Sequence, residues 1–131
     1  AGLRMGWVVG RADVIAALAK AKSQMDSGLS MPLQHLGAYA LSHQDKEWHA
    51  NMIAAYRNRR DKIAALLNKL GLTFDLPKGS LYIWAKISDG EESCEAFSMR
   101  ILEEQNIVLT PGTAFGKNGA RYVRASICTD I

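Results

Sequence analysis

Two arginines lie in segments where a permanent positive charge could bind an anionic ligand. Arg4 leads into an apolar run bounded by glycines, in AGLRMGWVVG, and Arg124 lies inside the strand-like segment RYVRASI. A guanidinium group is planar and always charged, and its fork of N–H donors matches the oxygens of a carboxylate or a phosphate. An arginine in a strand more commonly forms a surface ion pair at a sheet edge. The isolated pattern leaves both interpretations open for the two residues.

The cysteines and histidines of the chain do not form a recognisable metal or redox site. Cys94 and Cys128 lie far apart and neither belongs to a CxxC pair, which argues against a disulfide framework or a zinc site and favours reduced thiols in a cytoplasmic protein. The histidines, His35, His43 and His49, lack a metal-binding spacing such as HxxxH. We expect surface or capping roles for them and no bound metal.

Composition limits the class of protein. The chain has 131 residues, 48% of them hydrophobic and 22% charged, which is typical of one soluble globular domain. A net charge of +3 with mixed signs does not indicate a nucleic-acid partner. No apolar run approaches the ~20 residues of a membrane span, and no signal peptide is expected. We therefore expect neither a nucleic acid nor a membrane as partner.

The first half of the chain is predicted to be helical after one strand. Gly6–Gly10 has the apolar, β-branched character of a short buried strand. Apolar residues at helical spacing predict three helices, over residues 11–25, 31–43 and 46–70. Asp26–Gly28 separates the first two, Pro32 suits the first turn of the second, and Gly71 ends the third.

The second half is predicted to hold the sheet. Strands are expected over residues 72–76, 80–87, 107–109 and 120–128, with a helix over 91–106 and a glycine-rich loop over 110–119. Asp89 or Ser93 is expected to cap that helix, and Thr129–Asp130 looks like the cap of a further one. This order predicts an α+β fold, a small sheet of three to four strands with helices packed on it. The three tryptophans, Trp7, Trp48 and Trp84, are expected in the core.

Four segments of the chain resemble, in the same order, segments of the class I/II aminotransferases, which are fold-type I enzymes that use pyridoxal 5'-phosphate. They are AGLRMGWVVG with its G-x-R-x-G pattern, PKGSLYIW, LTPGTAFG and RYVRASI. Together they span nearly the whole chain. The resemblance implies the C-terminal portion of such an enzyme. Residues 1–28 would be the tail end of the cofactor-binding large domain, including its last strand and helix, and residues 29–131 the C-terminal small domain without its final helix.

The resemblance also gives the two arginines roles. It implies that Arg4 binds the cofactor phosphate, with Gly2 and Gly6 letting the backbone pass close to the cofactor, and that Arg124 pairs with the substrate α-carboxylate. The family's covalent lysine lies a few residues before the phosphate-binding arginine, and the aspartate for the pyridine nitrogen lies further upstream. We therefore expect both groups upstream of Ala1 and no catalytic residue in this chain. By itself the chain is expected to be inactive.

The function implied by the resemblance is transfer of an amino group between an amino acid and a 2-oxo acid, by a cytoplasmic homodimer. Two alternatives share the fold. One is a pyridoxal-phosphate-dependent carbon–sulfur lyase, and the other is the aminotransferase-like effector domain of a transcription regulator. Some dicarboxylate-specific members carry an arginine in the region of Asp26–Met31. This chain has none between Gln24 and Gln34, which disfavours an aspartate enzyme.

Two further segments have more than one interpretation. The basic run Arg57–Lys62 lies on a long amphipathic helix without an aromatic platform, so a solvated face is expected rather than a nucleic-acid site. Leu81 and Tyr82 follow a glycine that the family places near the substrate. One of the two is expected either to touch the substrate side chain or to pack in the core.

Overall fold

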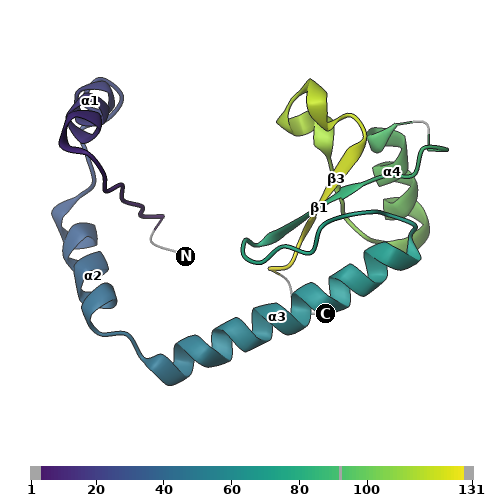
Figure 1. Ribbon diagram of the computed structural model, residues 1–131, viewed down its shortest axis with the longest axis horizontal. Helices are drawn as coiled ribbons and strands as arrows, with labels where there is room; N and C mark the ends of the chain where they lie inside the picture. The colour runs from purple at the N-terminus through teal and green to yellow at the C-terminus, as the bar shows by residue number, and fades with distance from the viewer. Residues whose placement is uncertain (1–3, 92, 129–131) are drawn as a thin grey trace. The chain divides into compact units, whose positions relative to one another are not determined.

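The computed structural model describes residues 4–91 and 93–128, and the chain divides into two compact units, Ala1–Lys46 and Glu47–Ile131 (Figure 1). Gly2 and the predicted cap Thr129–Asp130 lie outside the described residues. Within the described ranges, no helix combines the length and the apolar character that crossing a membrane requires.

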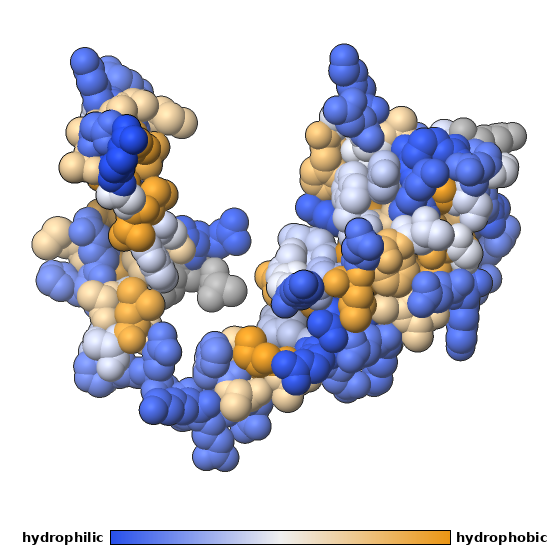
Figure 2. Space-filling model, in the orientation of Figure 1, coloured by the Kyte–Doolittle hydropathy of each residue, from blue (hydrophilic) through white to orange (hydrophobic). Residues whose placement is uncertain are grey.

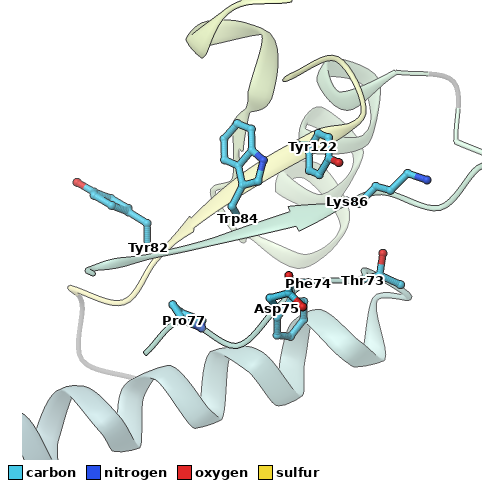
Figure 3. A pocket seen from close by; sticks show the side chains of 8 residues that line it. All are labelled: Thr73, Phe74, Asp75, Pro77, Tyr82, Trp84, Lys86 and Tyr122. Carbon is cyan, nitrogen blue, oxygen red and sulfur yellow. The ribbon is translucent and has the colours of Figure 1, made fainter. Parts of the chain in front are cut away.

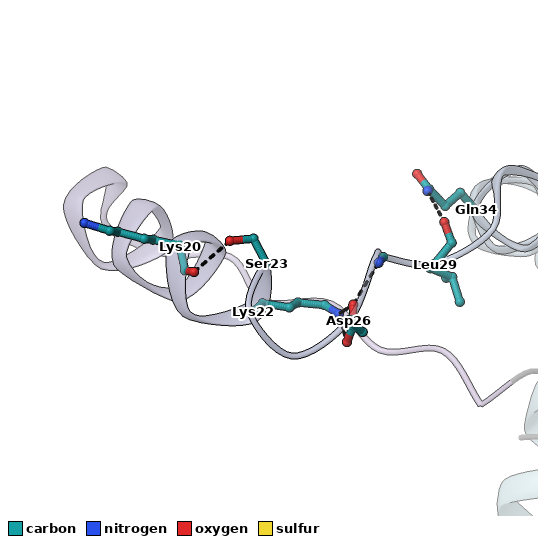
Figure 4. Close-up of polar contacts among 7 residues, drawn as sticks. Lys20, Lys22, Ser23, Asp26, Leu29 and Gln34 are labelled. Atoms are coloured by element: carbon teal, nitrogen blue, oxygen red, sulfur yellow. Dashed lines mark hydrogen bonds and ion pairs between the residues drawn. The ribbon is translucent and has the colours of Figure 1, made fainter.

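The first unit contains two of the predicted helices, α1 (Ala12–Lys22) and α2 (Met31–Ser42). Lys22 pairs with Asp26 at 2.6 Å, and the Asp26 carboxylate also accepts the backbone N–H of Gly28 at 2.8 Å (Figure 4). Gly28 has a φ of +94°, which a side chain would strain, so this turn separates the helices as predicted. Pro32 lies in the first turn of α2, where its missing N–H costs nothing.

The predicted buried strand Gly6–Gly10 is wrong. No strand forms there, and the side chains of Trp7, Val8 and Val9 are 63%, 64% and 86% exposed. A strand needs a neighbour for its backbone hydrogen bonds, and no described segment pairs with these residues. Apolar residues also gather on other parts of the surface, as Figure 2 shows.

The long helix α3 (Lys46–Lys69) lies in the second unit from its second residue on, and it matches the predicted 46–70. Gly71 ends it with a φ of +75°, donating its N–H to the carbonyl of Asn68, while Leu72 donates to Leu67. These bonds close the last turn in the manner of a glycine-terminated helix. The buried side chains of α3 lie in its second half, at Ile63, Ala64 and Leu67.

The sheet has three antiparallel strands in the order β1–β3–β2, within the predicted three to four. They are β1 (Tyr82–Lys86), β2 (Thr110–Pro111) and β3 (Tyr122–Ser126). The predicted strand 72–76 reduces to one bridge, Thr73 with Lys86. No strand forms over 107–109; the pairing starts one residue later, at Thr110. The two longer strands, β1 and β3, therefore form within their predicted ranges. The strands predicted over 72–76 and 107–109 do not form.

Helix α4 (Cys94–Gln105) crosses between the strands as predicted. Of the two proposed caps, Ser93 is correct, because its hydroxyl accepts the N–H of Ala96 at 3.0 Å. Asp89 instead pairs with Lys86 at 3.2 Å. The helix ends at Asn106 in the left-handed conformation, with a φ of +57°.

One face of the sheet is buried against α3 and α4. The core consists of Ile63, Ala64, Leu67, Leu72, Ile83, Ala85, Ile87, Cys94, Phe97, Ile101, Leu109, Val123, Ala125 and Ile127. Alternation along β1 and β3 sends every second side chain to the other face. The tryptophans are absent from this core, contrary to expectation. Trp84 lies on the open sheet face, Trp48 on the first turns of α3 and Trp7 in the unpaired segment, at 40%, 63% and 63% exposure.

Candidate functional site: an arginine on the open face of the sheet

Arg124 lies at the centre of the sheet. It is in the middle of β3, opposite Trp84 on β1 and Thr110 on β2. Its neighbours in sequence, Val123 and Ala125, are buried, so the pleat places Arg124 on the face opposite α3 and α4. The side chain is half-buried. The strand thus fixes the position of the Arg124 backbone and the face from which its side chain extends.

Aromatic rings surround the guanidinium of Arg124. Its central carbon lies 4.1 Å from the ring centre of Tyr82 and 4.4 Å from that of Phe115. Trp84 meets Phe115 edge-on at 5.6 Å and stacks on Tyr122 at 5.5 Å. Tyr82, Trp84 and Tyr122 project to the same side of the sheet (Figure 3). Contacts of this kind between a cation and ring faces are attractive, most of all where water is partly excluded.

A groove of about 640 Å³ runs beside β1, next to these rings. It opens because the chain leaves β1 after the single bridge at Thr73. Its lining combines aromatic, apolar and charged side chains: Thr73, Phe74, Asp75, Pro77, Tyr82, Trp84, Lys86 and Tyr122 (Figure 3). Sites of this size with a few polar groups suit small molecules.

A tight glycine loop carries Phe115 to Arg124. The predicted glycine-rich loop contains two short 3-10 helices after β2, Gly112–Phe115 and Lys117–Gly119. A Cβ on Gly112 would lie 2.2 Å from the carbonyl oxygen of Gly119, so no side chain fits there. Gly116 has a φ of +120°, which also favours glycine. The close approach of two backbone segments therefore requires glycine at position 112, and the positive φ favours it at position 116.

The loop is also tied to the first turn of α4. The hydroxyl of Thr113 donates to the carboxylate of Glu95. This bond, with help from the backbone of Glu95 and the thiol of Cys94, lowers the pKa of Glu95 from its ordinary 4.5 to about 2. A negative charge at a helix N-terminus is also favoured by the helix dipole.

Arg4 belongs to the first unit. Its side chain is exposed, its φ is +51°, and it has no hydrogen bond or ion pair with any residue of the described ranges. Beside it, a Cβ on Gly6 would meet no atom within 4 Å. Both features leave room for an anion, while the structure of this unit alone does not require Gly6 to be glycine.

The remaining candidates have structural roles. His43 follows α2 and lies within 3.1 Å of the carbonyl of Tyr39, on whose ring it stacks, in line with the expected capping role. In the basic run, Arg59 and Arg60 are half-buried rather than solvated: Arg59 donates to the carbonyl of Cys128 and Arg60 to that of Pro77. These bonds connect α3 to the rest of the second unit.

Sequence reasoning missed two members of the site. Phe115 was not singled out, and Trp84 was assigned to the core. Period-two alternation in YIWAK and YVRAS would have placed Trp84 and Arg124 on matching faces, since small or β-branched residues occupy the intervening positions. Of Leu81 and Tyr82, it is Tyr82 that contacts Arg124. No signal in the sequence locates Phe115, because the folding of the glycine loop brings it there.

Comparison with known proteins identifies relatives over the whole chain. Residues 1–130 match the family model for aminotransferase class I and II. The chain is 40% identical to an LL-diaminopimelate aminotransferase of Oleidesulfovibrio alaskensis, over 96% of this chain and 32% of that protein. Solved structures include an aminotransferase from Staphylococcus aureus, 36% identical with a TM-score of 0.78, which covers 98% of this chain and 34% of that one.

A third relative is similar at lower identity. The structure of an N-succinyldiaminopimelate aminotransferase from Mycobacterium tuberculosis is 27% identical with a TM-score of 0.77, over 98% of this chain and 34% of that one. The chain spans about a third of the length of the curated relatives it matches. Because the family model matches nearly every residue and the fold agrees, the chain belongs to the aminotransferase class I and II family.

Proposed function

We propose that the full-length protein is a pyridoxal-phosphate-dependent aminotransferase that moves an amino group between an amino acid and a 2-oxo acid, and that this chain forms its C-terminal portion. The observation that carries the proposal is Arg124. It presents a guanidinium on an open sheet face, between two rings and beside a groove, in a chain that matches the family over residues 1–130. We infer a cytoplasmic homodimer, with residues 1–28 in the large domain and 29–131 in the small domain.

Arg124 is proposed to hold the substrate α-carboxylate. Its planar fork of donors matches two carboxylate oxygens, and it forms no ion pair or hydrogen bond with another side chain of the described ranges that would compete. Two parallel bonds fix the direction of the carboxylate as well as its position. The Cα–H bond of the substrate is thereby held in one orientation, and orientation of this kind contributes directly to rate.

Arg4 is proposed to hold the cofactor phosphate. Its exposed side chain and the open space beside Gly6 fit a bulky dianion, and a guanidinium forms charge-assisted bonds with phosphate oxygens. When bound, the cofactor supplies the electron sink for the reaction. The proton-transferring lysine is inferred to lie upstream of Ala1, so the part played by this chain is binding and orientation.

The test is an amino-transfer assay on the purified full-length protein. Several amino acids, LL-diaminopimelate among them because of the names of the relatives, are offered with 2-oxo acid acceptors. We expect formation of a new amino acid and a new 2-oxo acid in equal amounts, dependent on added pyridoxal phosphate. Release of a thiol and ammonia without acceptor would instead identify a carbon–sulfur lyase. Specific DNA binding without turnover would identify a regulator.

A further inference from the structure

Two aromatic rings, those of Tyr82 and Phe115, contact the guanidinium of Arg124. Tyr82 comes from β1 and Phe115 from the loop that follows β2, and β3 lies between these two strands. The rings therefore reach the guanidinium from the two sides of β3, at 4.1 and 4.4 Å from its central carbon. Both distances are well inside the range over which a cation and a ring attract each other.

Ring contacts restrict a guanidinium in a particular way. The face of each ring lies towards the central carbon of the group, and the N–H donors lie at the edge of that planar group. No side chain of the described ranges accepts a hydrogen bond from Arg124, so the donors at that edge remain available. A long arginine side chain ordinarily loses much rotational freedom when it binds a ligand. Here the rings restrict that freedom before any ligand arrives.

The ring of Phe115 is itself supported. Trp84 meets Phe115 edge-on, with 75° between the ring planes, and stacks on Tyr122 at 15°. The close approach of Gly112 to Gly119 fixes the loop that carries Phe115. These contacts fix the position of the Phe115 ring, and the backbone of β1 fixes that of Tyr82.

We propose that Tyr82 and Phe115 are positioning residues that hold the guanidinium of Arg124 flat, so that its edge meets the substrate carboxylate in one orientation. The proposal rests on the proposed function of Arg124. The hydroxyl of Tyr82 has no part in it, because the ring face makes the contact. Removing either ring leaves the charge of Arg124 in place, but the guanidinium is then no longer held in one orientation.

The test compares ring-removing and ring-keeping variants of the full-length enzyme. Tyr82→Leu and Phe115→Leu are expected to lower kcat/KM for the amino acid by on the order of ten- to a hundredfold, mostly through KM. Tyr82→Phe keeps the ring and is expected to stay within about twofold of the wild type. Affinity for pyridoxal phosphate, measured by titration, is expected to be unchanged in all three. Both side chains are on the exposed face, so the core remains intact.

Tyr56→Leu is the matched control. Tyr56 stacks on Arg59 at 5.3 Å, so this variant removes an arginine–tyrosine contact elsewhere on the second unit. Its KM is expected to equal that of the wild type. Wild-type KM in both leucine variants, or equal damage in Tyr82→Phe and Tyr82→Leu, would overturn the proposal.

Comparison with Arg124→Lys distinguishes a failure of the positioning role from a failure of the proposed function. If Arg124→Lys raises KM while the two leucine variants do not, Arg124 binds the carboxylate without help from the rings, and only the positioning role is lost. If Arg124→Lys also leaves KM unchanged, the assignment of Arg124 fails and the positioning role fails with it.

Discussion

Trp84 and Arg124 are partners across β1 and β3, and both lie on the face of the sheet opposite the one that packs on α3 and α4. Their side chains reach the same ring, that of Phe115. An apolar surface and a fixed cation are thus combined in one patch of the small sheet. A small molecule with a carboxylate and a side chain can use both parts at once.

Arg124→Lys in the full-length enzyme is expected to raise the KM for amino acids strongly. Lysine keeps the charge and loses the two-bond fork and the contact of the guanidinium with the two rings. A loss on the order of 2–4 kcal/mol in kcat/KM is expected, because orientation of the substrate suffers together with binding. Steady-state kinetics measures the change. Wild-type kinetics would show that Arg124 is an ordinary strand arginine.

Arg4→Lys is expected to show the opposite pattern. The variant should lose cofactor more readily, since a lysine contacts phosphate as a point charge and not through a planar fork. Its KM for amino acids, measured with saturating cofactor, should remain near that of the wild type. Absorbance titration with pyridoxal phosphate checks this. Unchanged cofactor affinity would remove Arg4 from the phosphate site.

The 131-residue chain by itself is expected to show no amino transfer. The family resemblance places the covalent lysine outside it, so pyridoxal phosphate should be removed by dialysis. Absorbance spectra before and after dialysis, with the full-length enzyme alongside, test this. A cofactor band that persists in the 131-residue chain and responds to amino acids would contradict it.

Glu95 is expected to make stability depend on pH in the acid range. Its pKa is lowered to about 2 in the folded state from an ordinary 4.5, so between these values the unfolded chain binds more protons. The stabilisation is complete above pH 4.5 and is lost as the pH falls towards 2. Thermal unfolding from pH 6 to pH 2 should show a smaller acid dependence for Glu95→Gln. Glu103→Gln, an exposed position on the same helix, should behave like the wild type.

Gly112→Ala is expected to destabilise the loop that carries Phe115. The new methyl group would meet the carbonyl oxygens of Gly119 and Tyr122 at 2.2 and 2.7 Å, and backbone atoms cannot move aside cheaply. A cost of about 1–3 kcal/mol in unfolding free energy is expected, as for other overpacked sites. Gly79→Ala is the control, since a Cβ there meets nothing within 4 Å. Denaturant unfolding that ranks the two variants equally would contradict the prediction.

Local patterns in the sequence predict the four helices and the two longer strands of the sheet. Spacing of apolar residues, Pro32, Ser93 and Gly71 act within a few residues of the chain, so α1 to α4 appear where the pattern predicts them. Alternation along β1 and β3 likewise follows from local composition. Resemblance of four segments was enough to predict the family, which the match over residues 1–130 confirms.

Contacts between residues far apart in the sequence depend on the packing of the elements. The strand predicted at Gly6–Gly10 and the one at 107–109 do not form, because a strand exists only where a neighbour supplies hydrogen bonds, and local sequence does not reveal that neighbour. Phe115 reaches Arg124 because Gly112 and Gly119 approach closely, and Trp84 stands opposite Arg124 because of the register between β1 and β3. These contacts join residues distant in sequence, so they depend on the packed chain as a whole.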